Sequence, residues 1–481
     1  MPATTAPILP SNDFPDWLSP IVVKELRQGL KSRAFVSIAT ILQGGMALMF
    51  VLAALSRMSP GGSGVDTLSG FFWFMLWIPL IFVMPGRALQ AIAEETKVQT
   101  LELVQMTRMQ SLRIAFGKWL ALTVQSFLLV LAILPYFVLR YFFGGVDLVN
   151  DFTSLLFLLA FSMVLTASGL AASTLKPGLR IVLVIVSVGF LLIGGQVFAM
   201  ISAFGVGGPF GGFSWPNSPW LGSLAAIILV AAYVTFFLLQ AAGHLSTQVE
   251  SYSSKKRSLA LLSVFVILLA WILFTQSIID LRILALLTPL VLWSVAEALV
   301  ELNDPDWLVG RHQPLWNIPF RPGWSGGFFF ALIIFAVIFT GVLLGSQPTD
   351  VEGMQKSFVI FIGAVITPAL LLIRMPRIKQ RLLFYWLIHL LFALAFVVAL
   401  LISTRPGLSD EIALAYLAPL PPATALACIE QEMDIDFIRT VFPVTATVTT
   451  ILLSIFTLSA LSALSALLAL RPKSSDASIP S

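Results

Sequence analysis

Charge is what this sequence has least of. Charged side chains make up 11% of the 481 residues, whereas 58% of the residues are hydrophobic. In a soluble domain about a quarter of the residues are charged. The composition therefore excludes an ordinary soluble protein and predicts an all-α polytopic membrane protein.

Cysteine and the common catalytic motifs are also scarce. Cys428 is the single cysteine, which excludes an intramolecular disulfide and a cysteine-based metal cluster. The sequence contains no G-x-x-x-x-G-K-[ST] and no H-E-x-x-H. It therefore predicts no P-loop nucleotide site and no zinc protease site. We expect a protein that is not an enzyme and has no catalytic residue, metal or cofactor of its own.

The N-terminus lacks the features of a cleavable signal. The stretch "MPATTAPILPSNDFPDW" is neither basic nor apolar, so we expect no signal peptide. The first apolar block, from about Val36, would then act as an uncleaved signal anchor.

Long apolar runs dominate the rest of the chain. A membrane-spanning helix needs roughly 20 apolar residues, and about twelve segments meet this requirement. The predicted spans lie near 36–56, 69–86, 119–141, 152–174, 180–203, 220–242, 258–276, 281–300, 326–346, 357–374, 382–403 and 443–470. An even number of spans returns the C-terminus to the side on which the chain starts.

The basic residues are biased towards one set of loops. Of the 28 Lys and Arg residues, most precede the first span or lie in every second loop. Cytoplasmic loops carry such an excess, so both termini are predicted to be cytoplasmic. We expect a multi-pass protein of the bacterial cytoplasmic (inner) membrane.

The segment "SPIVVKELRQGLKSRAF" (19–35) predicts an amphipathic helix. Ser19 suits the N-cap and Pro20 the first helical position. Lys24, Arg27 and Lys31 recur on the polar side, which is typical of a helix that lies on the membrane surface among anionic headgroups. Simple juxtamembrane charge that sets the topology is the alternative.

The stretch "EETKVQTLELVQMTRMQSLRIAFGKW" (94–119) is unusually polar for this chain. Counted at about 100° per residue, a helix from about Leu89 has one apolar face, and Glu94, Glu95 and Glu102 lie on the other. These charges are too costly for a membrane span. The pattern favours a cytoplasmic docking helix, and a solvated linker is the alternative.

These two segments resemble ABC-2 type ABC transporter permeases. The family pattern runs roughly N-P-I-x-x-K-E-L-R at the N-terminus, then E-R-E-x-G-T-L-E-L, L-T-P-L-S and G-K around a coupling helix. The matching residues are Pro20, Ile21, Lys24, Glu25, Leu26 and Arg27, then Glu95, Thr100, Leu101, Glu102, Leu103, Thr107, Gly117 and Lys118. Thr96, Lys97, Gln99 and Arg108 depart from the pattern.

The resemblance implies a domain plan and a partner. Residues 1–35 would form a cytoplasmic tail and an interfacial helix that includes Lys24, Glu25 and Arg27. The resemblance covers about residues 19–242, which include a six-helix unit at 36–242 with a coupling helix at about 88–116. The apolar runs that follow add a linker at 243–257, a second six-helix unit at 258–470 and a tail at 471–481. The coupling helix would dock a separate ABC ATPase, which binds the ATP, through Glu94, Glu95, Thr100, Leu101, Glu102 and Leu103.

Other polar residues in the spans have modest functional signals. His389 lies inside the eleventh predicted span, and Glu297 and Glu301 lie near the cytoplasmic end of the eighth. Intramembrane ionisable groups are functional candidates, although a hydrogen-bonded histidine and snorkelling or capping carboxylates explain them as well. Small residues in "LSALSALSALLAL" near the C-terminus indicate helix packing.

The function expected from the sequence is that of an exporter permease subunit in contact with the lipid bilayer. A non-transporting scaffold that docks a cytoplasmic partner and an ion-coupled secondary transporter are the alternatives. A homodimer or a second permease subunit stays open, as does the transported substrate. No feature indicates a nucleic-acid partner.

Overall fold

The computed structural model describes helical parts of both halves of the chain. The described residues are 20–57, 64–94, 110–143, 148–175, 180, 219–246, 252–275, 290–291, 293–298, 315–320, 323–345 and separate positions between 362 and 394. These residues form helices and no strand. The chain divides into two compact units, Met1–Lys176 with Phe237–Thr247, and Pro177–Phe236 with Gln248–Ser481.

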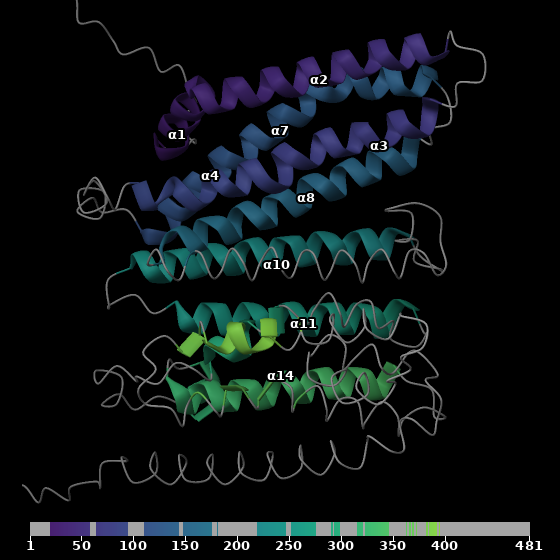
Figure 1. Cartoon of the computed structure of the whole chain (residues 1–481). Coiled ribbons are helices and arrows are strands. Elements are labelled where there is room, and N and C mark those ends of the chain that lie inside the picture. The colour runs from purple at the N-terminus through teal and green to yellow at the C-terminus, as the bar shows by residue number, and fades with distance from the viewer. Residues whose placement is uncertain are drawn as a thin grey trace, which may run out of the picture. The chain divides into compact units, whose positions relative to one another are not determined.

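The first unit is a layered bundle of long helices, several of which run alongside one another (Figure 1). Its elements are α1 (Pro20–Lys31), α2 (Arg33–Arg57), α3 (Gly64–Trp77), η1 (Ile78–Val83), α4 (Met84–Ala91), α7 (Ser111–Phe143) and α8 (Leu148–Ser173). The helix α10 (Pro219–Leu245) contributes its residues from Phe237 onwards to this unit.

Five helical segments in the described part of the chain are long and apolar enough to cross a membrane. They are Arg33–Leu55, Phe71–Ala91, Ser111–Phe142, Ser154–Ser173 and Ile227–Leu245. Each overlaps a span predicted from the sequence, and together they indicate a multi-pass membrane protein. The prediction of an all-helical membrane protein is thereby confirmed at this coarse level.

The other seven predicted spans are described less completely. The helices α11 (Ser253–Thr275) and α14 (Trp324–Gly345) cover the predicted spans 258–276 and 326–346. The predicted spans near 281–300, 357–374 and 382–403 contain described helical positions. The predicted spans 180–203 (apart from Arg180) and 443–470 lie outside the described residues. The count of twelve stays a prediction.

A π-helical turn lies in the middle of the second span. The chain is helical from α3 through η1 into α4, and the N–H of Met84 donates to the carbonyl oxygen of Pro79. Pro79 has no N–H to donate, and widening the helix by one residue accommodates it. No new helix begins at Leu89, where the sequence suggested a start, because α4 continues the span through that position.

One carbonyl group of this turn accepts a hydrogen bond from the neighbouring helix α8. Ser162 of α8 is fully buried, and its hydroxyl donates to the carbonyl oxygen of Leu80 at 2.7 Å. Close packing of α8 on α4 follows two turns further along α8, where a Cβ added at Gly169 would lie 2.8 Å from the carbonyl oxygen of Pro85. A glycine is therefore needed for this approach.

We predict that Ser162→Ala lowers the free energy of unfolding by about 1 kcal/mol, the size of interhelical hydrogen bonds in membranes. Ser168→Ala is the matched control, because the Ser168 hydroxyl donates only within its own helix, to Leu165 at 2.8 Å. Denaturant unfolding in detergent micelles measures both. Equal losses for the two variants would show that the Ser162 bond does not stabilise the π turn.

The second unit is built around α11 and α14. Its apolar core includes Val264, Ile267, Val295, Phe330 and Ile334, all at most 2% exposed. Two tyrosines place hydroxyls in this apolar surrounding, and both have partners. The Tyr385 hydroxyl donates to the carbonyl oxygen of Val365 at 3.0 Å, and the Tyr233 hydroxyl accepts from the N–H of Leu290 at 3.1 Å.

Candidate functional site

The corner between α1 and α2 is fixed by Ser32. Its hydroxyl donates to the carbonyl oxygen of Gly29 at 2.6 Å and accepts from the N–H of Phe35 at 3.2 Å. The second bond is a helix N-cap, which satisfies one of the free N–H groups at the start of α2. One residue therefore ends α1 and starts the first span.

The helix α1 packs against the first turns of α7. A Cβ added at Gly117 would lie 3.0 Å from the Cγ2 atom of Ile21, and a Cβ at Gly29 would collide with the side chain of Gln125. Val22 is 4% exposed in this contact. Two glycines, one on each helix, thus allow the two backbones to approach.

An ion pair joins the same two helices. The ammonium group of Lys118 in α7 lies 2.9 Å from the Oε1 atom of Glu25 in α1, with the side chains 4% and 23% exposed. Lys118 also donates to the carbonyl oxygen of Ala91, at 3.5 Å, near the end of α4. This lysine therefore contacts α1 and α4 from its place on α7.

Arg87 makes a second set of contacts one helical turn before Ala91. Its guanidinium group donates to the Oε1 atom of Gln125 at 2.5 Å and to the Ser32 hydroxyl at 3.5 Å. Gln125 is 1% exposed on α7. We call Glu25, Ser32, Arg87, Lys118 and Gln125 the polar junction. It fastens α1, α4 and α7 together at one end of the first unit.

The polar junction holds three helices together through charged and amide groups. Its charged and amide groups satisfy one another across three helices, and breaking one contact leaves a poorly solvated partner. The described residues contain no group of three or more His, Cys, Asp or Glu side chains that could hold a metal ion. The arrangement can hold helices in register and transmit a displacement from one to another.

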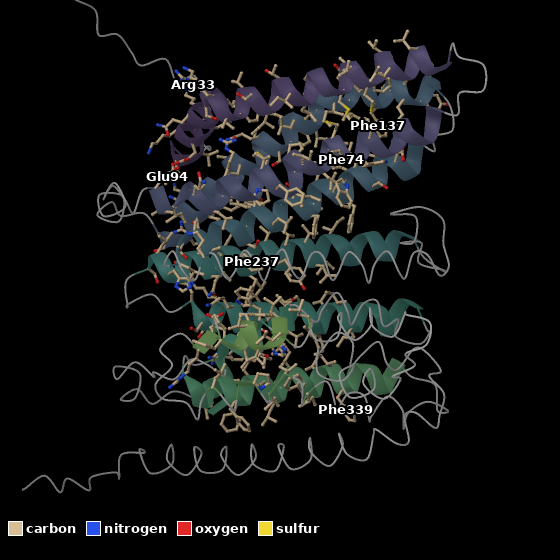
Figure 2. All side chains as sticks on the ribbon, in the orientation of Figure 1. Arg33, Phe74, Glu94, Phe137, Phe237 and Phe339 are labelled. Atoms are coloured by element: carbon tan, nitrogen blue, oxygen red, sulfur yellow. The ribbon has the colours of Figure 1, made fainter. Side chains whose placement is uncertain are left out.

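The residues predicted for the interfacial helix lie on or beside this junction. Lys24 and Arg27 are exposed on α1, while Glu25 turns inward to Lys118. Figure 2 shows Glu94 and Arg33 at the end of the unit where α1 lies. Glu94 is exposed just beyond α4. The other predicted docking residues, Glu95, Thr100, Leu101, Glu102 and Leu103, lie outside the described residues.

Sequence reasoning missed Arg87, Gln125 and Ser32 as parts of a site. It treated Arg87 only as a topology signal, and it did not pair Lys118 with Glu25. A glutamine inside "LALTVQSFLLV" is a polar residue in an apolar span, and such residues usually have a partner on another helix. That signal was available for Gln125.

We predict that Glu25→Gln destabilises the protein more than Lys118→Met. The first change leaves the deeply buried lysine without its carboxylate, at a cost of about 1–3 kcal/mol, whereas the second leaves a carboxylate that reaches water. The free energy of unfolding in detergent micelles measures the difference. The double variant should cost less than the sum of the single changes. Additive losses would show that the ion pair contributes no stability.

A second ion pair joins the last turn of α7 to the first turn of α8. Arg140 pairs with Asp151 at 2.8 Å, and its guanidinium carbon is 5.0 Å from the centroid of the Phe72 ring. An arginine over an aromatic face gains a cation–π attraction. Because Lys118 and Arg140 lie about 33 Å apart along a straight helix, α7 is held by a charge pair near each end.

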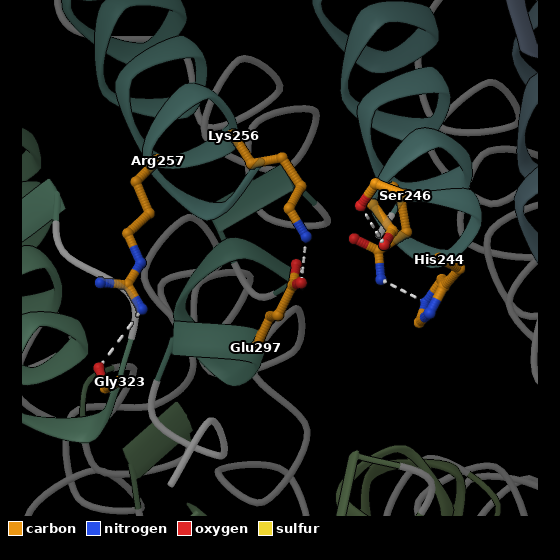
Figure 3. Close-up of polar contacts among 8 residues, drawn as sticks. His244, Ser246, Lys256, Arg257, Glu297 and Gly323 are labelled. Atoms are coloured by element: carbon orange, nitrogen blue, oxygen red, sulfur yellow. Dashed lines mark hydrogen bonds and ion pairs between the residues drawn. The ribbon is translucent and has the colours of Figure 1, made fainter. Parts of the chain in front are cut away.

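The second unit has a charged cluster of its own, at the start of α11 (Figure 3). Lys256 pairs with Glu297, and Arg257 donates to the carbonyl oxygens of Pro319 at 3.2 Å and Gly323 at 3.4 Å. The Ser254 hydroxyl donates to the carbonyl oxygen of Phe320 at 2.5 Å. The bonds to Pro319 and Phe320 fasten the 3₁₀ turn η2 (Leu315–Phe320) to α11.

Two functional candidates from the sequence fall in the second unit. Glu297, considered as a proton-relay residue, contacts Lys256 and is 22% exposed. His389 is 8% exposed. The centroid of its ring lies 4.5 Å from the ring centroid of Tyr385 and 6.3 Å from that of Trp386. Glu301 and the small residues between 458 and 470 lie outside the described residues. The roles considered for these residues stay predictions.

We predict that Gly323→Ala lowers the free energy of unfolding by about 1–2 kcal/mol, the cost of the left-handed region for a residue with a Cβ. Gly323 has a φ of 106° and starts the turn into α14. Gly86→Ala is the control, because a Cβ there meets nothing within 4 Å. In a helix it should raise stability by about 0.5–1 kcal/mol. Thermal unfolding in detergent measures the stability of both variants. The prediction would be contradicted if Gly323→Ala and Gly86→Ala changed the stability in the same direction.

Comparison with known proteins identifies no relative. No protein-family model, curated protein or solved structure matches the chain. The function is therefore argued from the residues and from the contacts that they make.

Proposed function

We propose that the chain is the membrane-spanning permease subunit of an ABC-2 type ABC exporter, driven by a separate ATPase. The observation that carries this proposal is the contact of Lys118 with Glu25. These residues belong to the two sequence segments that resemble the permease family, and 93 positions separate them along the chain. The segments are thus parts of one physical site.

The polar junction gives a route by which a partner could move the spans. The stretch after Glu94 contains the proposed docking residues Glu95 and Glu102, and it connects α4 to α7. Lys118 and Arg87 tie the end of α4 to α7 and to α1. A push on this stretch would therefore displace three helices together, without any bond being made or broken in the chain.

The energy source has to be another polypeptide in this proposal. The sequence contains no P-loop, so it lacks the glycine-rich turn and lysine that hold ATP phosphates. Acidic residues in the docking stretch would meet a partner of complementary charge. We place the docking stretch, the polar junction and both termini on the cytoplasmic side of the bacterial inner membrane, following the bias of basic residues.

Affinity purification from the native membrane tests the partner. The wild-type chain in mild detergent should retain a P-loop ATPase that hydrolyses ATP. Reversing two charges with Glu95→Lys and Glu102→Lys should reduce the recovered ATPase at least tenfold, since like charges across an interface cost several kcal/mol. Asp66→Lys, a reversal at the start of α3, is the matched control and should leave recovery unchanged.

The possible outcomes separate the class of protein from the contact. If both variants retain the ATPase, the exporter class stands and the docking stretch is wrong. If the well-folded wild type retains no P-loop ATPase, the exporter proposal fails. A membrane scaffold or an ion-coupled transporter would then have to explain the chain.

A further inference from the structure

The surface of α1 is divided into three sectors. At about 100° per residue, Ile21, Val22, Glu25 and Gly29 fall together on the side that contacts α7. Val23, Leu26 and Leu30 form a second, partly exposed apolar sector. Lys24, Arg27 and Lys31, with Gln28, form a third sector that is exposed.

The position of α1 along the membrane follows from the first span. This span begins at Arg33, and Ser32 alone separates it from the end of α1. The helix α1 therefore lies at the level where the span leaves the hydrocarbon. An apolar sector beside a basic sector is the arrangement of a helix embedded in a membrane interface.

We propose that the basic sector of α1 binds anionic phospholipid headgroups and passes the presence of this negative charge to the end of α4. The partner is an anionic lipid because three cations recur on one side of the helix while its one carboxylate, Glu25, turns inward to Lys118. Exposed basic residues at a membrane surface are attracted to anionic leaflets.

The contacts of Glu25 provide the link to α4. A movement of α1 towards the headgroups pulls on Glu25, which holds the ammonium of Lys118. Lys118 in turn donates to the carbonyl oxygen of Ala91. Gln90, its exposed neighbour on α4, should report the result. This device operates whether or not an ATPase is bound, so it does not rest on the proposed function.

Two fluorescent labels test the proposal in the full-length chain. Replacing the single native cysteine with Cys428→Ser allows an environment-sensitive dye at Gln28→Cys on α1, or at Gln90→Cys on α4. The chain is placed in nanodiscs of phosphatidylcholine alone, or of equal parts phosphatidylcholine and phosphatidylglycerol. Both labels should change their emission in the anionic discs, and high salt should weaken the change because it screens surface charge.

Neutral and charge-preserving variants identify the source of the response. Lys24→Gln, Arg27→Gln and Lys31→Gln together should lower the preference for the anionic surface by about a hundredfold, since each cation contributes about fivefold. Lys24→Arg, Arg27→Lys and Lys31→Arg keep the charge and should keep the response. Equal emission of the α1 label in both lipids, or a normal response of the neutral variant, would overturn the proposal.

Glu25→Gln tests the link separately. It leaves all three cations in place, so the label on α1 should still respond to anionic lipid. The label on α4 should lose its response, because Lys118 no longer holds α1. A label on α4 that responds fully in this variant would overturn the proposed path through Lys118.

Discussion

The burial of the Lys118 ammonium group constrains the whole end of the first unit. An unpaired ammonium at 4% exposure would be very costly, so α1 has to present Glu25 at one fixed position. Ala91 lies close to the end of α4, where helix carbonyl groups lack partners within the helix, and its carbonyl oxygen is thereby available as the second acceptor. Gly117 and Gly29 then follow, because only small residues let α1 approach α7 closely enough for the ion pair. The charge of Lys118 thus joins α1, α4 and α7.

This constraint joins the start of the first span to the end of α4. Ser32 lies between α1 and the first span and caps the start of that span. Arg87 of α4 donates to the hydroxyl of the same serine, which gives a second contact between α4 and this corner. In the proposed exporter permease, such a joint would pass a displacement of the polar stretch after Glu94 to three helices at once. The second unit also uses buried cations, since Arg257 fastens η2 to α11 and Lys256 pairs with Glu297. Buried cations therefore fasten neighbouring elements in both units of the described part of this chain.

The sequence predicted what depends on local composition. Ser19-Pro20 marked the start of α1, and apolar length located the five spans that the structure describes. The sequence did not show what depends on distant pairs. Lys118 and Glu25 are 93 positions apart, and nothing in either segment specifies the other. The π turn was missed because Pro79 in an apolar run is equally compatible with a kink, and the true response depends on Ser162 from another helix. The sequence also did not show that α4 runs through Leu89 to Ala91, because an amphipathic pattern does not tell a new helix from the extension of a span.

Amide hydrogen exchange of the Lys118→Met variant tests the central claim, that one lysine holds α1 and α4 together, most directly. Compared with the wild type in the same membrane, exchange should become faster both in residues 20–31 and in residues 88–94. Lys118→Arg keeps the charge and should exchange more slowly than Lys118→Met in both segments. Faster exchange in α1 alone, or in neither segment, would contradict the claim, because α4 would then be held without Lys118.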